Sequence, residues 1–274
     1  MMCAWESVLG ILPPWLRQEV NRKGKEGLQE LRLRLDKPPE LDFGRTQLWL
    51  ERVVREEDLL FCINTASRYS PWASETISQG YLTISGGHRL GICGETFRKD
   101  DKIAGIRHVR SINIRIARDF PGIGATSVPR QSLLILGAPG WGKTTLLRDI
   151  AREIARREKV AVVDERGELF PEGMEQGRRM DILTGCPKEA GIDMVLRTMG
   201  PEWIALDEIT AASDTSAILQ VRGCGVRLIA TAHASSLEEF RNRPIYRPLL
   251  TYGVFHSFLV LGPDKTWRTE RMAG

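Results

Sequence analysis

The sequence predicts an α/β fold with a mostly parallel sheet between helices, preceded by a smaller α+β domain at the N-terminus. Three observations support this prediction. Short β runs alternate with helical segments from residue 121 onward, a glycine-rich loop joins the first of these runs to a helix, and glycine and proline cluster just before this region. A chain of 274 residues with 42% hydrophobic content can bury two cores.

The expected first domain, residues 1–120, mixes short helices and strands. Hydrophobic spacing predicts a helix that ends near Val20 and another near Asp58–Ser67. Strand-like alternation occurs three times in this domain, at Leu31–Leu35, Arg89–Phe97 and Ile112–Ala117. Residues 119–124 read Asp-Phe-Pro-Gly-Ile-Gly, a composition that favours a linker or hinge, so the domain boundary is expected there.

The expected second domain, residues 121–274, contains the parallel sheet. Its predicted strands are short apolar runs, at Ser132–Leu136, Val160–Val163, Trp203–Leu206, Val226–Thr231 and Val254–Leu261. A helix over Thr144–Arg157 follows the first run, with apolar residues at helical spacing, at Leu147, Ile150, Ala151 and Ile154. We expect this stripe to face the sheet, and Arg152 to lie off it.

The cysteine composition and the absence of targeting signals predict a cytoplasmic protein without structural disulfides or zinc. The five cysteines are scattered and odd in number, and no two of them form a Cys-x-x-Cys pair. No apolar run reaches the roughly 18 residues of a membrane span. Residues 1–10 lack the basic start of a signal peptide. We therefore expect reduced thiols and a cytoplasmic location.

The loop after the first predicted strand fits the P-loop pattern, and the predicted helix follows it directly. Its residues are Gly137, Ala138, Pro139, Gly140, Trp141, Gly142, Lys143, Thr144 and Thr145. The glycines let backbone N–H groups turn towards phosphate oxygens, and the helix start adds its positive dipole end. Lys143 is expected to reach the β- and γ-phosphates and Thr144 to bind Mg²⁺, so this loop predicts a site for ATP.

An apolar run that ends in two acids supplies the second half of such a site. Residues 203–208 read Trp-Ile-Ala-Leu-Asp-Glu. An acid at the end of this strand holds Mg²⁺ in P-loop enzymes, a role that we assign to Asp207. Glu208 is then the expected general base, which orients and polarises the attacking water.

Two further strand ends carry polar residues at the same expected edge of the sheet. Asp164 and Glu165 follow the second run, where they could contact water or metal, or form an ordinary solvated turn. His233 follows the fourth run, where it could sense a γ-phosphate, or be a turn histidine with local partners. The residue pattern leaves these alternatives open.

With these elements in order, the chain resembles the secretion-type hexameric ATPases of type II and type IV machines, whose core is a RecA-like P-loop NTPase domain. The resemblance rests on the P-loop, an acidic box at 163–166, the Asp207-Glu208 strand end and a histidine box at 230–233. It implies Mg²⁺-dependent hydrolysis of ATP, with Glu165 and His233 as further residues of the site.

Within that group the chain resembles the AA family of stage III sporulation proteins over nearly its whole length. The shared motifs are Tyr69-Ser-Pro71, Gln79-Gly-Tyr81, Gly86-Gly-His-Arg89, Asn113-Ile-Arg115, the P-loop helix to Asp149, Asp164-Glu-Arg166 and Cys186-Pro-Lys188. The resemblance implies an ATPase at the cytoplasmic side of a channel complex between mother cell and forespore, docked on a membrane protein. Two residues depart from the pattern: Trp141 is bulky for the loop, and Thr210 stands where the family usually has glycine.

Charge on the transferred phosphoryl group requires more cations than Lys143 and Mg²⁺ provide, and related enzymes insert an arginine. Arg115 and Arg110 on strand-like sequence, and Arg197 within the core, are candidates, with ordinary solvated arginines as the alternative. We expect a ring, a hexamer, in which a neighbouring subunit completes each site.

Two other functions use the same core. A RecA- or helicase-like motor would depend on nucleic acid, and the sequence pI near 8.9 is compatible with it. The sequence has no long basic run and no interleaving of aromatic and basic residues, so we expect no nucleic-acid partner. A small-molecule phosphotransferase would need an acceptor pocket, for which the sequence has no marker.

Overall fold

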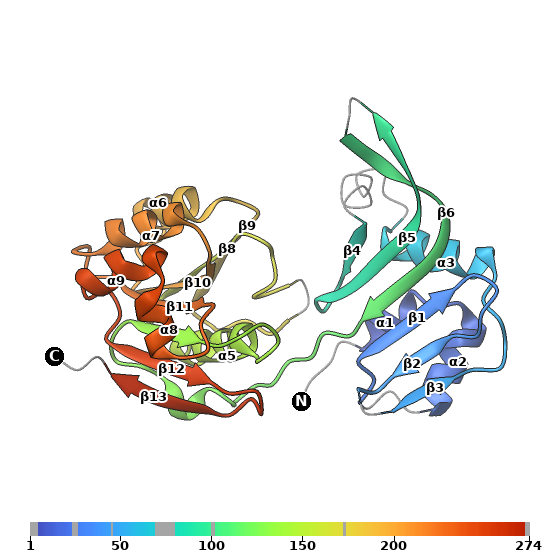
Figure 1. Ribbon diagram of the computed structural model, residues 1–274, viewed down its shortest axis with the longest axis horizontal. Helices are drawn as coiled ribbons and strands as arrows, with labels where there is room; N and C mark the ends of the chain where they lie inside the picture. Colours follow the sequence, from blue (N-terminus) through green and yellow to red (C-terminus); the bar gives the residue numbers. More distant parts are fainter. Residues whose placement is uncertain are drawn as a thin grey trace. The chain divides into compact units, whose positions relative to one another are not determined.

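The computed structural model describes residues 5–23, 27–44, 46–68, 80–99, 102–171 and 174–271. The motif Tyr69-Ser-Pro71 and the residue Gln79 lie outside these ranges. The chain divides into two compact units, which we call the N-terminal unit (Met1–Asp119 with Pro171–Met174) and the C-terminal unit (Phe120–Phe170 with Glu175–Gly274) (Figure 1).

The N-terminal unit is built on a six-stranded antiparallel sheet with the strand order β3-β2-β1-β6-β5-β4. The strands are β1 (Glu30–Arg34), β2 (Glu40–Asp42), β3 (Gln47–Trp49), β4 (Tyr81–Ile84), β5 (His88–Lys99) and β6 (Lys102–Arg115). Its helices are α1 (Trp5–Gly10), α2 (Pro14–Lys23) and α3 (Glu56–Ala66). Alternate strand residues such as Leu31 and Leu33 are buried against apolar residues of these helices, as expected for a sheet with one covered face.

Motifs of the N-terminal unit shape this sheet. Gly86 and Gly87 both have positive φ angles, 87° and 78°, in the turn between β4 and β5, a conformation that favours glycine. His88 is fully buried, and its Nδ1 accepts the backbone N–H of Ala117 at 3.0 Å. The guanidinium of Arg89 lies 3.8 Å from the centre of the Tyr81 ring. These residues have structural roles in the sheet.

The C-terminal unit has a seven-stranded sheet with the order β13-β12-β7-β11-β10-β8-β9. The strands are β7 (Leu133–Leu136), β8 (Val160–Asp164), β9 (Met180–Thr184), β10 (Trp203–Ile209), β11 (Arg227–Ala232), β12 (Ser257–Leu261) and β13 (Trp267–Arg271). All neighbouring pairs are parallel except β12 and β13. This arrangement confirms the predicted mostly parallel sheet.

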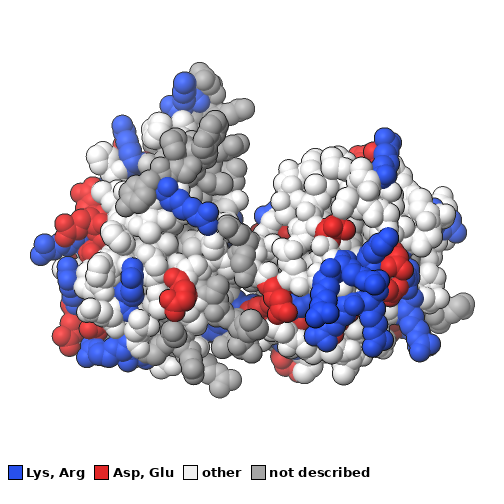
Figure 2. All heavy atoms as spheres, turned by 180° about the vertical axis from the view of Figure 1, so that it is seen from behind, with Lys and Arg blue, Asp and Glu red and all other residues white. Residues whose placement is uncertain are grey.

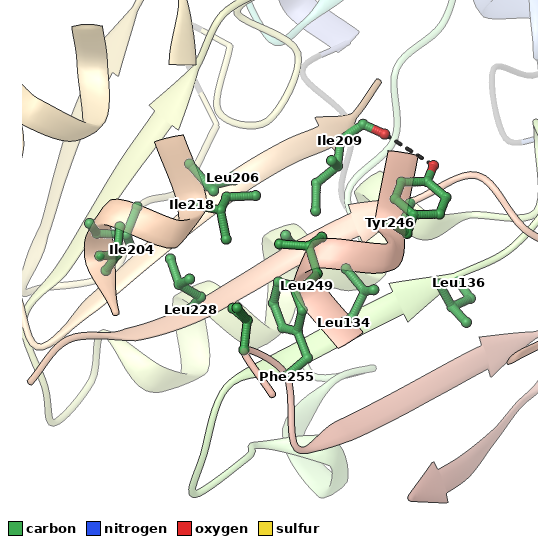
Figure 3. Close-up of a cluster of buried hydrophobic side chains, with 14 of the residues drawn as sticks. Leu134, Leu136, Ile204, Leu206, Ile209, Ile218, Leu228, Tyr246, Leu249 and Phe255 are labelled. Atoms are coloured by element: carbon green, nitrogen blue, oxygen red, sulfur yellow. Dashed lines mark hydrogen bonds between the residues drawn. The ribbon is translucent and has the colours of Figure 1, made fainter. Parts of the chain in front are cut away.

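Helices cover both faces of the parallel sheet. The helices are α5 (Lys143–Ile154), α6 (Lys188–Thr198), α7 (Ala212–Val221), α8 (Leu237–Asn242) and α9 (Arg247–Thr251), with 3₁₀ turns at Ala125–Ser127 and Pro244–Tyr246. The apolar stripe of α5 packs on one face, as predicted. Residues of α6 to α9 pack on the other face, where Leu206, Ile218, Leu249 and Phe255 form part of a continuous core (Figure 3). Burial on both faces explains why β7 and β8 are fully buried.

The structure corrects several predicted boundaries. Helix α5 ends at Ile154, three residues earlier than expected, and β12 begins at Ser257 because Val254 and Phe255 pack into the core before the strand starts. Strands β9 and β13 lie at the two edges of the sheet and were not predicted. Both are partly exposed along their length, so neither forms a continuous apolar run.

Arg152 was expected away from the buried stripe of α5, but it is only 3% exposed. Its Nη1 binds Oδ1 of Asp149 at 3.0 Å, and its Nε donates to the carbonyl oxygen of Glu175 at 3.2 Å. A buried arginine is tolerated when its charge and its N–H groups have such partners. The prediction for Arg152 was wrong because it considered the charge of the side chain and not its buried partners.

The glycine-rich segment at 119–124 is anchored to α5. Asp149 is fully buried, and its carboxylate accepts the backbone N–H groups of Gly122 at 3.0 Å and Gly124 at 2.7 Å. A Cβ atom on Gly124 would lie 2.6 Å from Cγ1 of Ile150, so the segment approaches α5 closely. This part of the expected hinge is fixed to the P-loop helix.

Among the described helices, none has the length and apolar composition needed to cross a membrane. The cysteines within the described residues carry free thiols, at Cys62, Cys93, Cys186 and Cys224.

Candidate nucleotide-binding site

The loop between β7 and α5 has the backbone shape of an anion cradle. Gly140 and Gly142 have φ angles of 76° and 99°, in the left-handed region that glycine tolerates best. A Cβ atom on Gly137 would lie 3.3 Å from Cβ of Leu261 and 3.3 Å from Cγ of Lys143, so the loop starts in a tight space. Helix α5 begins immediately afterwards, and its N-terminus favours negative charge.

Trp141 fits this loop without distorting it. The side chain is half-buried and packs against the core under α5. Its backbone N–H donates to the carbonyl oxygen of Ala138 at 3.3 Å. The bulky residue therefore contributes apolar contact to the core. Thr144 and Thr145 follow in the first turn of α5 and are half-buried.

Lys143 is the cation of the loop and is only 8% exposed. Its amino nitrogen donates to the carbonyl oxygen of Ala138 at 3.3 Å and lies 3.5 Å from Oε1 of Glu208. The ion pair joins the P-loop to the end of β10. The two predicted halves of the site therefore lie together.

The pairing of β10 with β11 is irregular at the two acidic residues, Asp207 and Glu208. Leu206 pairs with Ala230 of β11 and Glu208 with Thr231, so Asp207 is skipped in the register. Bulges of this kind often redirect side chains next to active sites. Asp207 is 7% exposed; burial, and then the nearby charge of Asp164, raise its pKa to about 6.

Glu208 is the meeting point of three segments. Its Oε1 lies 3.5 Å from Nζ of Lys143 and 3.5 Å from Nδ1 of His233, which follows β11. This oxygen is buried and makes no hydrogen bond with any residue that the structure describes. A carboxylate oxygen with free acceptor capacity in such a place can bind a water molecule or another donor.

The acidic pair after β8 has two different environments. Asp164 is fully buried, and its two carboxylate oxygens accept the backbone N–H groups of Glu168 at 3.0 Å and Leu169 at 2.7 Å. Asp164 therefore stabilises the loop that follows β8. Glu165 is 43% exposed and binds Nζ of Lys188 at 2.9 Å.

Lys188 lies beside Glu165, and the sequence pattern alone predicts no role for it. It was part of the Cys186-Pro-Lys188 motif, which offered a signal but no role. Its side chain is 6% exposed, and besides Glu165 it lies 3.8 Å from Oδ2 of Asp214. Burial of its charge between two carboxylates could not be predicted from local spacing.

The turn after β10 accommodates Thr210 without strain. Thr210 is not among the residues with positive φ. Oδ2 of Asp214 accepts the backbone N–H groups of Thr210 at 2.8 Å and Ala211 at 3.1 Å. Tyr246 adds a second support, because its hydroxyl donates to the carbonyl oxygen of Ile209 at 3.2 Å (Figure 3). A glycine is therefore unnecessary at position 210.

The three candidate arginines lie on exposed surfaces of their own units. Arg115 and Arg110 belong to β6 of the N-terminal unit, where Nε of Arg115 donates to Oε1 of Glu30 at 3.2 Å. Arg197 lies in α6, is 76% exposed and binds Asp193 one helical turn earlier.

The described residues fit a nucleotide with a divalent cation. The positive-φ glycines, the start of α5 and Lys143 supply donors and positive charge for phosphate oxygens. The Thr144 hydroxyl and the Asp207 carboxylate are hard oxygen ligands of the kind that Mg²⁺ takes alongside phosphate. Oε1 of Glu208, which accepts no hydrogen bond from a described residue, provides an acceptor beside them.

Two solved structures share the fold. An ATPase, DotB, from Legionella pneumophila is 17% identical, with a TM-score of 0.61 over 95% of this chain and 80% of that chain. The pilus retraction motor PilT, solved with bound ADP, is 11% identical, with a TM-score of 0.64 over 95% and 78% of the two chains. The C-terminal sheet therefore has the RecA-like arrangement that the sequence predicted.

The sequence comparisons identify the family. A Bacillus subtilis (strain 168) protein, Stage III sporulation protein AA, is 35% identical over 256 residues, which cover 87% of this chain and 83% of that protein. Residues 5–271 match the family described as "Sporulation stage III, protein AA". The chain belongs to this sporulation stage III, protein AA family.

Proposed function

We propose that this chain is an ATP-hydrolysing motor of the secretion-ATPase type, which binds ATP with Mg²⁺ on the P-loop. One observation carries the proposal. Lys143, Glu208 and His233 come from three separate segments and meet at distances of 3.5 Å at the carboxyl edge of the parallel strands. Open α/β sheets bind their ligands at this edge.

The P-loop residues would bind the phosphates. Backbone N–H groups at the start of α5 would bind phosphate oxygens, and Lys143 would exchange its contact with Glu208 for the β- and γ-phosphate oxygens. When bound, Mg²⁺ would neutralise phosphate charge, and Thr144 and Asp207 are the residues that would hold it.

Glu208 would act as the general base. Its Oε1 can accept a hydrogen bond from a water molecule and orient that water towards the γ-phosphorus. His233 lies on the other side of the same oxygen and would report the presence of the γ-phosphate. Glu165, held by Lys188 at the neighbouring strand end, is the second carboxylate of this edge.

The working form that we propose is a ring, a hexamer, with an arginine inserted from a neighbouring subunit. Arg115 is the first candidate, because its side chain is 68% exposed on β6. Arg110 is also exposed on the same strand, and Arg197 is the candidate within the C-terminal unit. An inserted arginine stabilises transition-state charge by roughly 10³-fold or more in related enzymes.

The cellular role that we propose follows from the family. ATP turnover would energise a channel complex between mother cell and forespore, with the chain in the cytoplasm at the inner face of the membrane. A membrane protein of that complex would be its docking partner. Membership of the sporulation family and the fold shared with DotB and PilT support this role.

The alternative, a nucleic-acid-dependent motor, has less support. Figure 2 shows one cluster of Lys and Arg side chains on the C-terminal unit, with Asp and Glu beside it, and further Lys and Arg side chains that lie apart from it. On the described part of that face, the cluster does not continue as an unbroken basic track of the kind that follows a nucleic-acid backbone.

The experiment that tests the proposal measures phosphate release by the purified chain with ATP, with and without Mg²⁺. We expect Mg²⁺-dependent turnover that the Lys143→Ala variant lacks and the Lys159→Ala variant retains, because Lys159 is an exposed lysine away from the loop. Turnover that appears only with single-stranded DNA or RNA would favour the nucleic-acid motor. Equal turnover in all three chains would contradict the proposed site.

A further inference from the structure

Lys188 occupies an unusual place for a lysine. It is the first residue of α6, and only 6% of its side chain is exposed. The start of a helix carries partial positive charge, which disfavours a cation. Removal of the ammonium group from water adds a further cost. An ammonium group in this position therefore depends on nearby carboxylates.

Two carboxylates, one in the loop after β8 and one at the start of α7, supply the opposite charge. Oε2 of Glu165, in the loop after β8, lies 2.9 Å from Nζ of Lys188. Oδ2 of Asp214, in the first turn of α7, lies 3.8 Å from the same nitrogen. Strands β8 and β10 are parallel neighbours, so the loop after β8 and the segment from β10 to α7 emerge at the same edge of the sheet. The buried ammonium group of Lys188 thus connects the loop after β8 to the start of α7.

Asp214 extends this connection to Glu208. Its Oδ2 accepts the backbone N–H groups of Thr210 and Ala211, which immediately follow β10. Oε1 of Glu208 lies 3.5 Å from Lys143 and from His233 and accepts no hydrogen bond from a described residue, so the position of the side chain also depends on the backbone around it. The turn at Thr210, which Asp214 holds, is a part of that backbone.

We infer that Lys188 is a positioning residue for ATP hydrolysis: it holds Glu165 at the strand edge and, through Asp214, fixes the turn that follows Glu208. The inference rests on the proposed function. Lys188 acts on the rate of hydrolysis and leaves nucleotide binding to the P-loop. A misplacement of about 1 Å in a catalytic group can reduce a rate by roughly 10²-fold.

The test compares Lys188→Met, Lys188→Arg and the exposed-surface control Lys159→Met, each in the full chain. Methionine keeps the apolar stem and removes the charge. Neither carboxylate is then left buried without a donor, because Glu165 is 43% exposed and Asp214 keeps the backbone N–H groups of the turn after β10. We expect kcat of Lys188→Met to fall by about 10-fold to 10²-fold. The Kd for a non-hydrolysable ATP analogue should stay within about 2-fold, because the P-loop is intact.

Further chains separate positioning from a general loss of stability. Lys188→Arg keeps the charge and should recover part of kcat. Glu165→Gln, at a half-exposed position that tolerates a neutral amide, should lower kcat in the same direction. The double variant Glu165→Gln with Lys188→Met should be no slower than Lys188→Met alone, because both changes break one connection.

The outcomes distinguish this inference from the proposed function. If the wild type hydrolyses ATP and Lys188→Met matches its kcat, the inference is overturned while the proposed function stands. Loss of analogue binding in Lys188→Met would also overturn it, because Lys188 would then contact the nucleotide. If Lys188→Met does not fold, a wild-type kcat in Glu165→Gln overturns the inference in its place. A wild type that turns over ATP no faster than Lys143→Ala removes the proposed function and this inference together.

Discussion

Nζ of Lys143 lies 3.5 Å from Oε1 of Glu208, so the P-loop and the end of β10 are joined by an ion pair between the two residues that are expected to bind phosphate and activate water. A triphosphate in the loop would compete with Glu208 for the lysine. Nucleotide binding would then release the carboxylate for its role as a base. This exchange links binding to catalysis within one contact.

The His233→Ala variant should bind ATP nearly as the wild type does and hydrolyse it slowly. Nδ1 of His233 lies 3.5 Å from the same Glu208 oxygen, so its loss leaves that carboxylate less well placed. We expect kcat to fall by roughly 10²-fold, as for other misplaced catalytic groups. Steady-state phosphate release and analogue binding check this, with His256→Ala as the exposed control. Wild-type turnover in His233→Ala would return it to the role of a turn histidine.

Replacement of Asp207 by asparagine should stabilise the nucleotide-free chain. Burial, and then the charge of Asp164, raise the pKa of Asp207 from 3.8 to about 6, so the charged form destabilises the folded state. This cost is fully present above pH 6 and disappears as the pH falls through 6 towards 3.8. The free energy of unfolding of Asp207→Asn should exceed that of the wild type by about 2 kcal/mol near neutral pH.

Urea unfolding at about pH 8 and about pH 4 measures this difference, which should shrink at the lower value. The exposed Asp193→Asn change is the control. If Asp207→Asn raises the free energy of unfolding equally at both pH values, or does not raise it, the charge of Asp207 does not destabilise the folded state.

The Asp149→Ala variant should be strongly destabilised. Asp149 is fully buried, binds Arg152 at 3.0 Å and accepts two backbone N–H groups from the segment that follows the domain boundary. Its removal leaves a buried guanidinium without this counter-charge, a change that costs about 3–5 kcal/mol. Asp193→Ala, on exposed α6 surface, should cost no more than about 0.5 kcal/mol. Similar losses for both variants in urea unfolding would contradict this interpretation.

A site shared between subunits predicts that specific activity rises steeply with protein concentration. Mixed chains give a sharper test: Lys143→Ala lacks the phosphate lysine and Arg115→Ala lacks the candidate inserted arginine, so a mixed ring contains some intact sites. We expect the mixture to recover activity that neither variant has alone. Light scattering under assay conditions reports the oligomer, and concentration-independent turnover by a monomer would exclude the shared site.

The parallel sheet could be predicted because its strands are buried on both faces. Runs such as Leu133–Leu136 and Val160–Asp164 are apolar throughout or nearly so, and the P-loop between β7 and α5 depends on local glycine geometry. Edge strand β9 gave no such signal, because its residues are partly exposed. The apolar pattern of the sequence therefore predicts the central strands of the sheet but not its edge strands, β9 and β13.

Long-range pairing explains what the sequence could not reveal about the site. Lys188 is 23 residues from Glu165 and reaches it only because β8 and α6 pack together. Arg152 was expected off the buried stripe because a charge usually faces water, and its buried partner Asp149 changes that outcome. The roles of Glu208 and His233 were expected from strand-end positions, and their 3.5 Å contact is a finding of the structure.

The most direct test of the central account is the fate of radiolabelled ATP on the Glu208→Gln variant with Mg²⁺, resolved into bound ATP and bound ADP by chromatography. The amide cannot take a proton from water, and it no longer holds Lys143 by charge. We predict that the variant retains unhydrolysed ATP with at least wild-type affinity while turnover falls by roughly 10²-fold or more, and that Lys143→Ala retains none. Wild-type turnover by Glu208→Gln would contradict the account and make Glu165 the better candidate for the base.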